Sequence, residues 1–281
     1  MNNQLGHLRA AIINSYKNLL NFPILEADLL LSGILKRDRA WILGHNDYRL
    51  TQEEHDLITQ AVKRRLTREP LEYILGEKDF CGLPITVTEG CLVPRPETEL
   101  LVQACLERFH SGPFMDWGTG TGCISLAILK QTQKSQALMV EKNPKSMVCA
   151  WKNLKKFDML DRAALWHSRT PKDIPFKEKL NLIVSNPPYI PTSQLPSLMP
   201  EVGQYEPHLA LDGGESGVEP YRLLFQTASS WLKTGSYLCL EIGGDNQISP
   251  ISQMAPSNFF MENPIRDFSN QARIICFKKT S

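Results

Sequence analysis

Hydrophobic and polar positions follow two different periods along the chain, and the change of period divides it. Through about residue 72, the apolar residues of "LRAAIINSYKNLL" and "EADLLLSGIL" recur every three or four positions, which is typical of amphipathic helices. Thr51 followed by Glu54 matches a capping box and predicts the start of another helix. We therefore expect residues 1–72 to form a small all-helical domain.

A short stretch of different character follows. Residues 73–96 contain β-branched positions interrupted by Gly82, Pro84 and Gly90 in "FCGLPITVTEGCLVPRP". Turn-forming residues between short β-prone runs predict a hairpin. We interpret residues 73–96 as a β-hairpin linker, and Pro96 as the first residue of the helix that follows.

Residues 97–281 alternate between the two periods. Helical patterns in "GCISLAILKQ", "PKSMVCAWKNLKKF" and "YRLLFQTASSWL" separate apolar runs such as "PFMDWG", "QALMVEKN", "AALWHS", "LNLIVSNPP" and "GSYLCLEIG". Strands that alternate with helices predict an α/β domain with a doubly wound, mostly parallel sheet. The last run, "QARIICFKK", is expected to be an edge strand.

Composition limits the partners that the protein can be expected to bind and the cellular compartment in which it is expected. The 281 residues carry a net charge of about +1, too little for a strong non-specific attraction to nucleic acid. Seven scattered cysteines without a C-x-x-C pair argue against a disulfide framework and a metal site, and fit a reducing compartment. The first residues do not resemble a signal peptide, and no apolar run approaches membrane-spanning length. We expect a cytoplasmic protein with no membrane partner and no metal.

A glycine-rich loop follows the first strand of the α/β part. Its G-x-G-x-G spacing differs from the G-x-G-x-x-G of dinucleotide folds and favours a nucleoside without a pyrophosphate. Glu141 ends the next strand, where an acidic side chain commonly binds ribose hydroxyls. Taken singly, the loop equally fits a tight strand-to-helix turn, and Glu141 a solvated strand end. Together they predict a cofactor site made by Glu141 and by Gly118, Thr119, Gly120, Thr121 and Gly122.

A second motif, Asn186-Pro187-Pro188-Tyr189, ends the strand "LNLIVS". Asn186 and Pro187 each precede a proline, so the segment is held extended, and the prolines lack amide hydrogens. The Asn186 side-chain carbonyl and the Pro187 main-chain carbonyl can then accept both hydrogens of a planar –NH2 group, with Tyr189 packed against that group. Out of context, the tetrapeptide also fits a proline turn in which Asn186 caps the backbone.

These motifs together resemble those of the class I S-adenosylmethionine-dependent methyltransferases that modify planar nitrogens. The stretches "EYILGEKDFCGLPITVTEGCLVPRPETELLV", "YEPHLALDGGESGVEPYRLL" and "LEIGGDNQ" are similar to the PrmC/HemK family of peptide chain release factor glutamine methyltransferases. The resemblance extends over nearly the whole chain. It implies a Rossmann-like methyltransferase domain preceded by a helical domain that positions a protein substrate.

The resemblance also implies the chemistry. The substrate would be the glutamine of the Gly-Gly-Gln motif in class I release factors, methylated on its side-chain N5. The glycine loop and Glu141 would bind S-adenosylmethionine together with Asn186, and Asn186 to Tyr189 would hold the glutamine amide. Asp116 would support the loop or the cofactor's amino group. No direct nucleic-acid partner is expected.

Some positions depart from the family pattern or leave an alternative open. The family usually has an acidic residue and an aromatic one near the adenine, where this chain has Ser168, Arg169 and Thr170. Arg95 and Glu97 follow the family pattern and are expected to line the cofactor cleft. The same Asn186 chemistry would serve a DNA or RNA amino-methyltransferase, and a cofactor-binding scaffold without catalysis is a further alternative.

Overall fold

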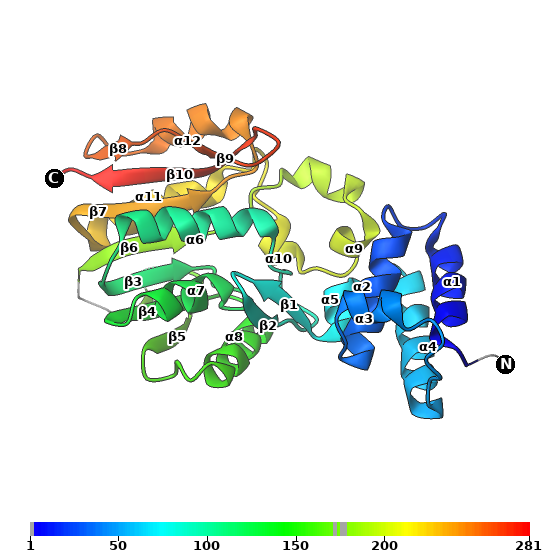
Figure 1. Cartoon of the computed structure of the whole chain (residues 1–281). Helices are drawn as coiled ribbons and strands as arrows, with labels where there is room; N and C mark the ends of the chain where they lie inside the picture. Colours follow the sequence, from blue (N-terminus) through cyan, green and yellow to red (C-terminus); the bar gives the residue numbers. More distant parts are fainter. Residues whose placement is uncertain (1–2, 171–172, 175–178) are drawn as a thin grey trace. The chain divides into compact units, whose positions relative to one another are not determined.

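The chain forms two compact units in the computed structural model, which describes residues 3–170, 173–174 and 179–281 (Figure 1). Unit 1 consists of Met1–Glu77 and Met199–Tyr205, and unit 2 of Lys78–Leu198 and Glu206–Ser281. Residues 1–2, 171–172 and 175–178 fall within the ranges expected for the two domains but lie outside the described residues.

Unit 1 is helical, as its period of apolar residues predicts. Thr51 and Glu54 form the expected capping box, because each side chain accepts a hydrogen bond from the other residue's backbone N–H, at 3.2 and 2.8 Å. Its buried side chains include Leu5, Tyr16 and Ile58. The helices of this unit are α1 (Leu5–Tyr16), α2 (Pro23–Leu35), α3 (Arg39–Gly44), α4 (Gln52–Leu66), α5 (Leu71–Leu75) and α9 (Pro200–Gly203).

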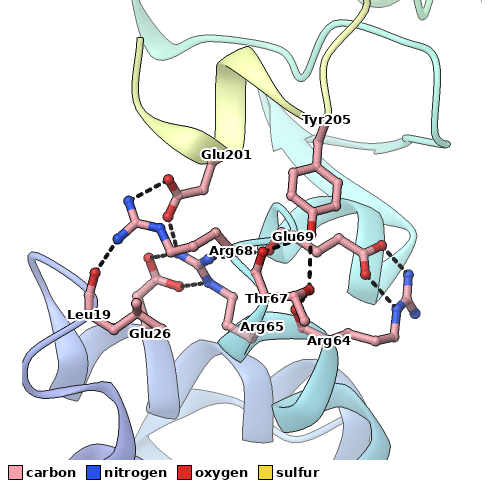
Figure 2. A network of polar contacts seen from close by, with 9 residues as sticks. All are labelled: Leu19, Glu26, Arg64, Arg65, Thr67, Arg68, Glu69, Glu201 and Tyr205. Atoms are coloured by element: carbon pink, nitrogen blue, oxygen red, sulfur yellow. Dashed lines mark hydrogen bonds and ion pairs between the residues drawn. The ribbon is translucent and has the colours of Figure 1, made fainter. Parts of the chain in front are cut away.

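One helix of unit 1, α9, comes from a distant part of the sequence and is held by arginines (Figure 2). Arg65 donates to Glu26 at 2.8 and 3.0 Å and to Glu201 at 3.0 Å. Arg68 donates to the other oxygen of Glu201 at 2.6 Å. We call Glu26, Arg65, Arg68 and Glu201 the arginine cluster. Residues 199–205, expected within the domain 97–281, therefore pack with the N-terminal helices.

The region expected to form a hairpin contains a two-stranded sheet. Strand β1 (Glu77–Phe80) pairs with β2 (Leu83–Thr86). Cys81 and Gly82 join them with φ values of 50° and 72°. Two successive residues with positive φ are typical of the tight turns whose twist matches a hairpin.

Unit 2 is built around a sheet with the strand order β5-β4-β3-β6-β7-β10-β8, and β9 pairs with β10. The pairs from β5 to β7 are parallel, and those of β10 are antiparallel. The strands are β3 (Gly112–Trp117), β4 (Ser135–Glu141), β5 (Ala163–His167), β6 (Leu180–Ser185), β7 (Leu232–Glu241), β8 (Phe259–Met261), β9 (Ile265–Arg266) and β10 (Ala272–Lys279).

Helices cover both faces of this sheet, so successive strand residues enter different cores. Phe114 of β3 packs in a core with α6 and α7, and the next residue, Met115, packs in a core with α11 and α12. The helices of unit 2 are α6 (Pro96–Arg108), α7 (Cys123–Gln131), α8 (Pro144–Lys156), η2 (Thr192–Ser197), α10 (His208–Leu211), α11 (Glu219–Trp231), η3 (Asp245–Gln247) and α12 (Ile248–Met254). Within the described ranges, no helix has the length and apolar character needed to span a membrane.

The expected position of the last strand is wrong. Strand β10 lies inside the sheet, between β7 and β8, and the register pairs Phe277 with Met261 and Lys279 with Phe259. The edge partner is only three residues long, "FFM", which is too short to show an alternating pattern in the sequence.

Candidate active site

The candidate site lies where the order of strands reverses. The chain runs from β3 to β4 and β5 in one direction and then returns to place β6 on the other side of β3. Such a switch point leaves a crevice at the carboxyl ends of the strands. A cavity of about 290 Å³ occurs at these ends in unit 2. Its lining includes Thr98, Trp117, Gly118, Thr119, Gly120, Thr121, Glu141, Ser168, Arg169, Asn186, Pro187 and Pro188.

The glycine loop follows β3 and turns sharply. Gly118, Gly120 and Gly122 have φ values of 76°, 57° and 80°, which side chains with a Cβ rarely adopt. Gly118 and Gly120 line the cavity, whereas Gly122 immediately precedes α7 as its N-cap and is not among the lining residues. A Cβ on Gly122 would lie 2.8 Å from the Met139 side chain, so this glycine permits close packing of the turn.

Asp116 supports the loop from inside the protein. Its carboxylate is fully buried and accepts hydrogen bonds from the hydroxyls of Thr119 and Ser125, both at 2.7 Å. Burial raises the pKa of Asp116 to about 6, although these two hydrogen bonds act in the opposite direction. Asp116 does not line the cavity. Of the two roles expected for it, the structure shows the contact with the loop.

Glu141 joins the glycine loop to the end of β4. One carboxylate oxygen accepts from the backbone N–H of Gly120 at 2.8 Å, and the other accepts from Lys142 and Asn143 at 2.8 Å each. The side chain is almost buried and still lines the cavity. A carboxylate fixed by three amides keeps lone pairs that can accept from ligand hydroxyls.

The Asn186-Pro187-Pro188 segment lines the cavity on the other side of the switch point. The amide nitrogen Nδ2 of Asn186 donates to the hydroxyl oxygen Oγ1 of Thr98 at 3.1 Å. Because Nδ2 is engaged there, Oδ1 is the atom of this amide that remains to accept from a ligand. Asn186, which lines the cavity, can therefore offer an acceptor atom to a ligand.

Tyr189 is placed differently from the three residues before it. It does not line the cavity, and its hydroxyl donates to Glu241 at 3.4 Å. Burial and the nearby charge of Glu241 raise the pKa of Tyr189 above its usual value. The Tyr189 hydroxyl therefore contacts the buried Glu241 and not the cavity.

Two further side chains, which the sequence did not indicate, form a hydrogen-bonded chain with Asn186. Thr98, on α6, accepts from Asn186 and donates its own proton to Glu241 at 2.7 Å. Glu241, at the end of β7, is 1% exposed. Burial raises the pKa of Glu241 to about 7. Their motifs, "PRPETE" and "LEIGG", were visible in the sequence, but nothing in them indicated that these two side chains meet.

The other residues named from the sequence divide between the cavity wall and positions outside it. Arg95 lines the cavity and forms an ion pair of 2.5 Å with the buried Glu206. Glu97 is not among the lining residues. Ser168 and Arg169 do line it, at the place where the family pattern has an acidic and an aromatic residue. Within the described residues, no group of three His, Cys, Asp or Glu side chains is arranged to hold a metal ion.

Comparisons with known proteins cover both units. Residues 17–76 match the model of the PrmC N-terminal domain, and residues 96–199 match the methyltransferase small domain. A release factor glutamine methyltransferase from Geobacter sulfurreducens is 40% identical over 220 residues, covering 78% of this chain and 76% of that protein. One from Thermodesulfovibrio yellowstonii is 34% identical over 275 residues, covering 95% and 97%.

Solved structures agree on the fold. A methyltransferase from Pyrococcus furiosus matches with a TM-score of 0.55 at 16% identity, covering 82% of this chain and all of that one. The ribosomal protein L11 methylase from Lactobacillus delbrueckii matches with a TM-score of 0.51 at 18% identity, covering 70% and 86%. These likenesses support the Rossmann-like methyltransferase fold expected from the sequence.

Proposed function

This chain belongs to the release factor glutamine methyltransferase family, and from that premise we propose that it methylates N5 of the glutamine in the Gly-Gly-Gln motif of a class I release factor. The methyl donor is S-adenosylmethionine. The observation that carries the proposal is the hydrogen bond from Nδ2 of Asn186 to Thr98, which leaves Oδ1 of this cavity-lining amide to accept from a ligand.

The cavity suits the cofactor. A Cβ on Gly118 would meet nothing within 4 Å, so the loop offers bare backbone beside open space. Gly118 to Thr121 would hold the methionine part of the cofactor, and Glu141 would accept from its ribose hydroxyls. When bound, the cofactor supplies a methyl group on a positively charged sulfur.

The substrate is a group with two hydrogens on a planar nitrogen. Oδ1 of Asn186 accepts one hydrogen, and the carbonyl of Pro187 accepts the other. An amide nitrogen is a weak nucleophile because its lone pair is delocalised, and two fixed acceptors favour the pyramidal form that exposes this lone pair. S-adenosylmethionine held by the glycine loop and Glu141 would supply the methyl group to this nitrogen and keep the electron pair of the carbon–sulfur bond. The nitrogen then releases one proton to water, so no base is needed before attack.

We assign unit 1 the role of holding the protein substrate, as its match to the PrmC N-terminal domain supports. The N-terminal part of α2 exposes apolar side chains that a protein partner could cover: Phe22, immediately before the helix, is 68% exposed, and Ile24 is 52% exposed. All seven cysteines are free thiols, which supports a reducing, cytoplasmic location.

The test uses methyl-labelled S-adenosylmethionine with two forms of a purified class I release factor. One form has the intact Gly-Gly-Gln motif, and in the other its glutamine is replaced by alanine. We expect label in the intact protein alone, on the glutamine side chain. Equal labelling of both forms would refute the substrate, and labelling of DNA or RNA in a parallel reaction would favour an amino-methyltransferase of nucleic acid.

A further inference from the structure

A chain of three side chains runs from the cavity into the interior of unit 2. Asn186 donates to Thr98 at 3.1 Å, and Thr98 donates to Glu241 at 2.7 Å. Thr98 is 3% exposed and Glu241 is 1% exposed, so water does not compete at the contact between these two side chains. The function proposed above uses only the first member of this chain.

The direction of these hydrogen bonds depends on Glu241. A threonine hydroxyl has a single proton. When Glu241 is ionised, it can only accept, so Thr98 donates its proton inward and its oxygen accepts from Asn186 Nδ2. If Glu241 carries a proton, it can donate to Thr98, and Thr98 can then donate outward. Asn186 would satisfy that donor by turning Oδ1 toward Thr98 and Nδ2 toward the cavity.

An asparagine amide is nearly symmetric in shape, so packing alone selects its orientation poorly. The two orientations differ in chemistry, because Oδ1 accepts from a substrate –NH2 group and Nδ2 repels it. Selecting one of them therefore requires a polar partner of defined direction, and Thr98 is that partner.

We propose that Glu241, acting through Thr98, is a positioning residue that keeps Oδ1 of Asn186 directed at the substrate nitrogen. This inference rests on the proposed function for the identity of the substrate. Thr98 and Glu241 are positioning residues here, since they act through Asn186.

The groups around Glu241 determine when it is ionised. Burial disfavours its charge, and the neighbouring charge of Glu97 on α6 adds to this. The hydroxyls of Thr98 and Tyr189 and the charge of Arg273 on β10 favour the ionised form. Tyr221 on α11 donates to the main-chain oxygen of Glu241 at 2.8 Å. With a pKa near 7, Glu241 gains a proton as the pH falls through neutrality, so turnover should decrease below that pH.

The first test compares turnover with labelled cofactor. Thr98→Val keeps the shape of the side chain and removes the hydroxyl, and we expect kcat to fall by about 10- to 100-fold with little change in cofactor affinity. Thr98→Ser restores the hydroxyl and should recover most of the activity. Thr227→Val is the matched control, because Thr227 is a buried threonine of α11 that bonds only its own helix at 2.8 Å.

The second test follows pH. Turnover by the native enzyme should decline as the pH falls from 8 to 6, and Glu241→Gln should remove that decline because it has no carboxyl group to titrate. Nuclear magnetic resonance of ¹⁵N-asparagine-labelled protein gives a readout without substrate. The Asn186 side-chain amide signal should titrate in the native protein and not in Glu241→Gln.

Three results would overturn the inference: full activity in Thr98→Val, a pH profile unchanged in Glu241→Gln, or an Asn186 signal that does not titrate. If Thr98→Val does not fold, Thr98→Ser, Glu241→Gln and the amide signal still decide the question. Failure of the proposed function has a different signature, namely no transfer to the release factor by the native enzyme, while the amide signal can still titrate.

Discussion

Two glutamates in this protein show how the same side chain acquires opposite properties. Glu241 lies beneath the cavity of unit 2, where its carboxylate contacts the hydroxyls of Thr98 and Tyr189. Glu201 lies in the arginine cluster of unit 1, where it accepts from Arg65 and Arg68 (Figure 2). Burial raises the pKa of Glu241 to about 7. Burial acts in the same direction on Glu201, but hydrogen bonds from the two arginines outweigh it and lower its pKa.

The difference lies in the partners rather than in the glutamate. Hydroxyl donors stabilise a carboxylate by hydrogen bonding only, and they leave much of the desolvation cost uncompensated. Guanidinium groups add a full positive charge in a fixed planar geometry. A carboxylate among hydroxyls can therefore exchange a proton near neutral pH, whereas one between arginines stays ionised and serves as an anchor.

The largest expected effect is a loss of turnover on substitution of Asn186, the residue that Glu241 positions through Thr98. Asn186→Ala removes the acceptor that selects the pyramidal amide, and we expect kcat to fall by about 100- to 1,000-fold. Cofactor affinity, measured by calorimetry, should change little. A variant with unchanged turnover would show that the Thr98–Glu241 chain does not lead to the reacting nitrogen.

The contribution of the arginine cluster to stability is tested by Arg65→Met, which leaves Glu26 and Glu201 without the buried cation that they share. We expect unit 1 to lose about 3 kcal/mol of stability, because the carboxylates are only partly exposed. Hydrogen exchange of residues 199–205 should report it directly. Arg64→Met is the control, since Arg64 is 48% exposed and its ion pair with Glu69 should contribute less than about 1 kcal/mol. Equal effects of the two variants would contradict the role of the cluster.

Glu241→Gln should stabilise unit 2 at high pH, although the same substitution removes the pH dependence of turnover. Because the pKa of Glu241 is raised from 4.5 to about 7, the native state retains a proton that the unfolded chain releases between these values. Stability therefore falls as the pH rises through this window. At pH 8 the variant should gain about 3 kcal/mol, and at pH 4.5 it should gain almost nothing. Denaturant unfolding at both pH values measures the difference.

The control for this unfolding measurement is the replacement of an exposed glutamate by glutamine. Glu107 is 54% exposed, so Glu107→Gln should change stability little at either pH. If both variants behave alike, the buried negative charge of ionised Glu241 is not what destabilises the native state at high pH.

The smallest effect is expected at Glu201. Its lowered pKa means that its contribution to stability is fully present above the usual value of 4.5 and is lost as the pH falls through the native value below it. Protection of residues 199–205 should therefore be constant from pH 6 to 8, where Glu241 titrates. Glu201→Gln should cost about 1 kcal/mol at neutral pH and remove the acid dependence. Loss of protection between pH 8 and 6 in the native protein would contradict this assignment.

Much of the fold could be predicted because it depends on local periodicity. The helices of unit 1, the turn at Cys81 and Gly82 and the alternating strands of unit 2 each follow from residues close together in the chain. The position of β10 could not be predicted, because it depends on pairing with a three-residue strand. The packing of residues 199–205 with unit 1 depends on Arg65 and Arg68, more than 130 positions earlier.

The candidate site likewise contains residues that the sequence predicted and residues that it did not. The glycine loop and Asn186 each follow a strand, and Glu141 is the last residue of one. The rule that parallel strands end at one edge was enough to bring them together. Thr98 and Glu241 are separated by 143 positions, and neither stands in a pattern that predicts its partner. Tyr189 adjoins Pro188 in sequence, yet its hydroxyl turns to Glu241 and not to the cavity.

The sequence by itself determined which atoms are available for the chemistry: an acceptor amide, donor-free prolines, a glycine turn and an acid one strand later. Periodicity and steric limits on the backbone carry that information locally. Tertiary structure decided the protonation and direction of those groups. Whether Glu241 titrates near neutrality, and which way Asn186 faces, depend on burial and on hydrogen-bond partners from distant segments, and such through-space electrostatics has no signature along a linear chain.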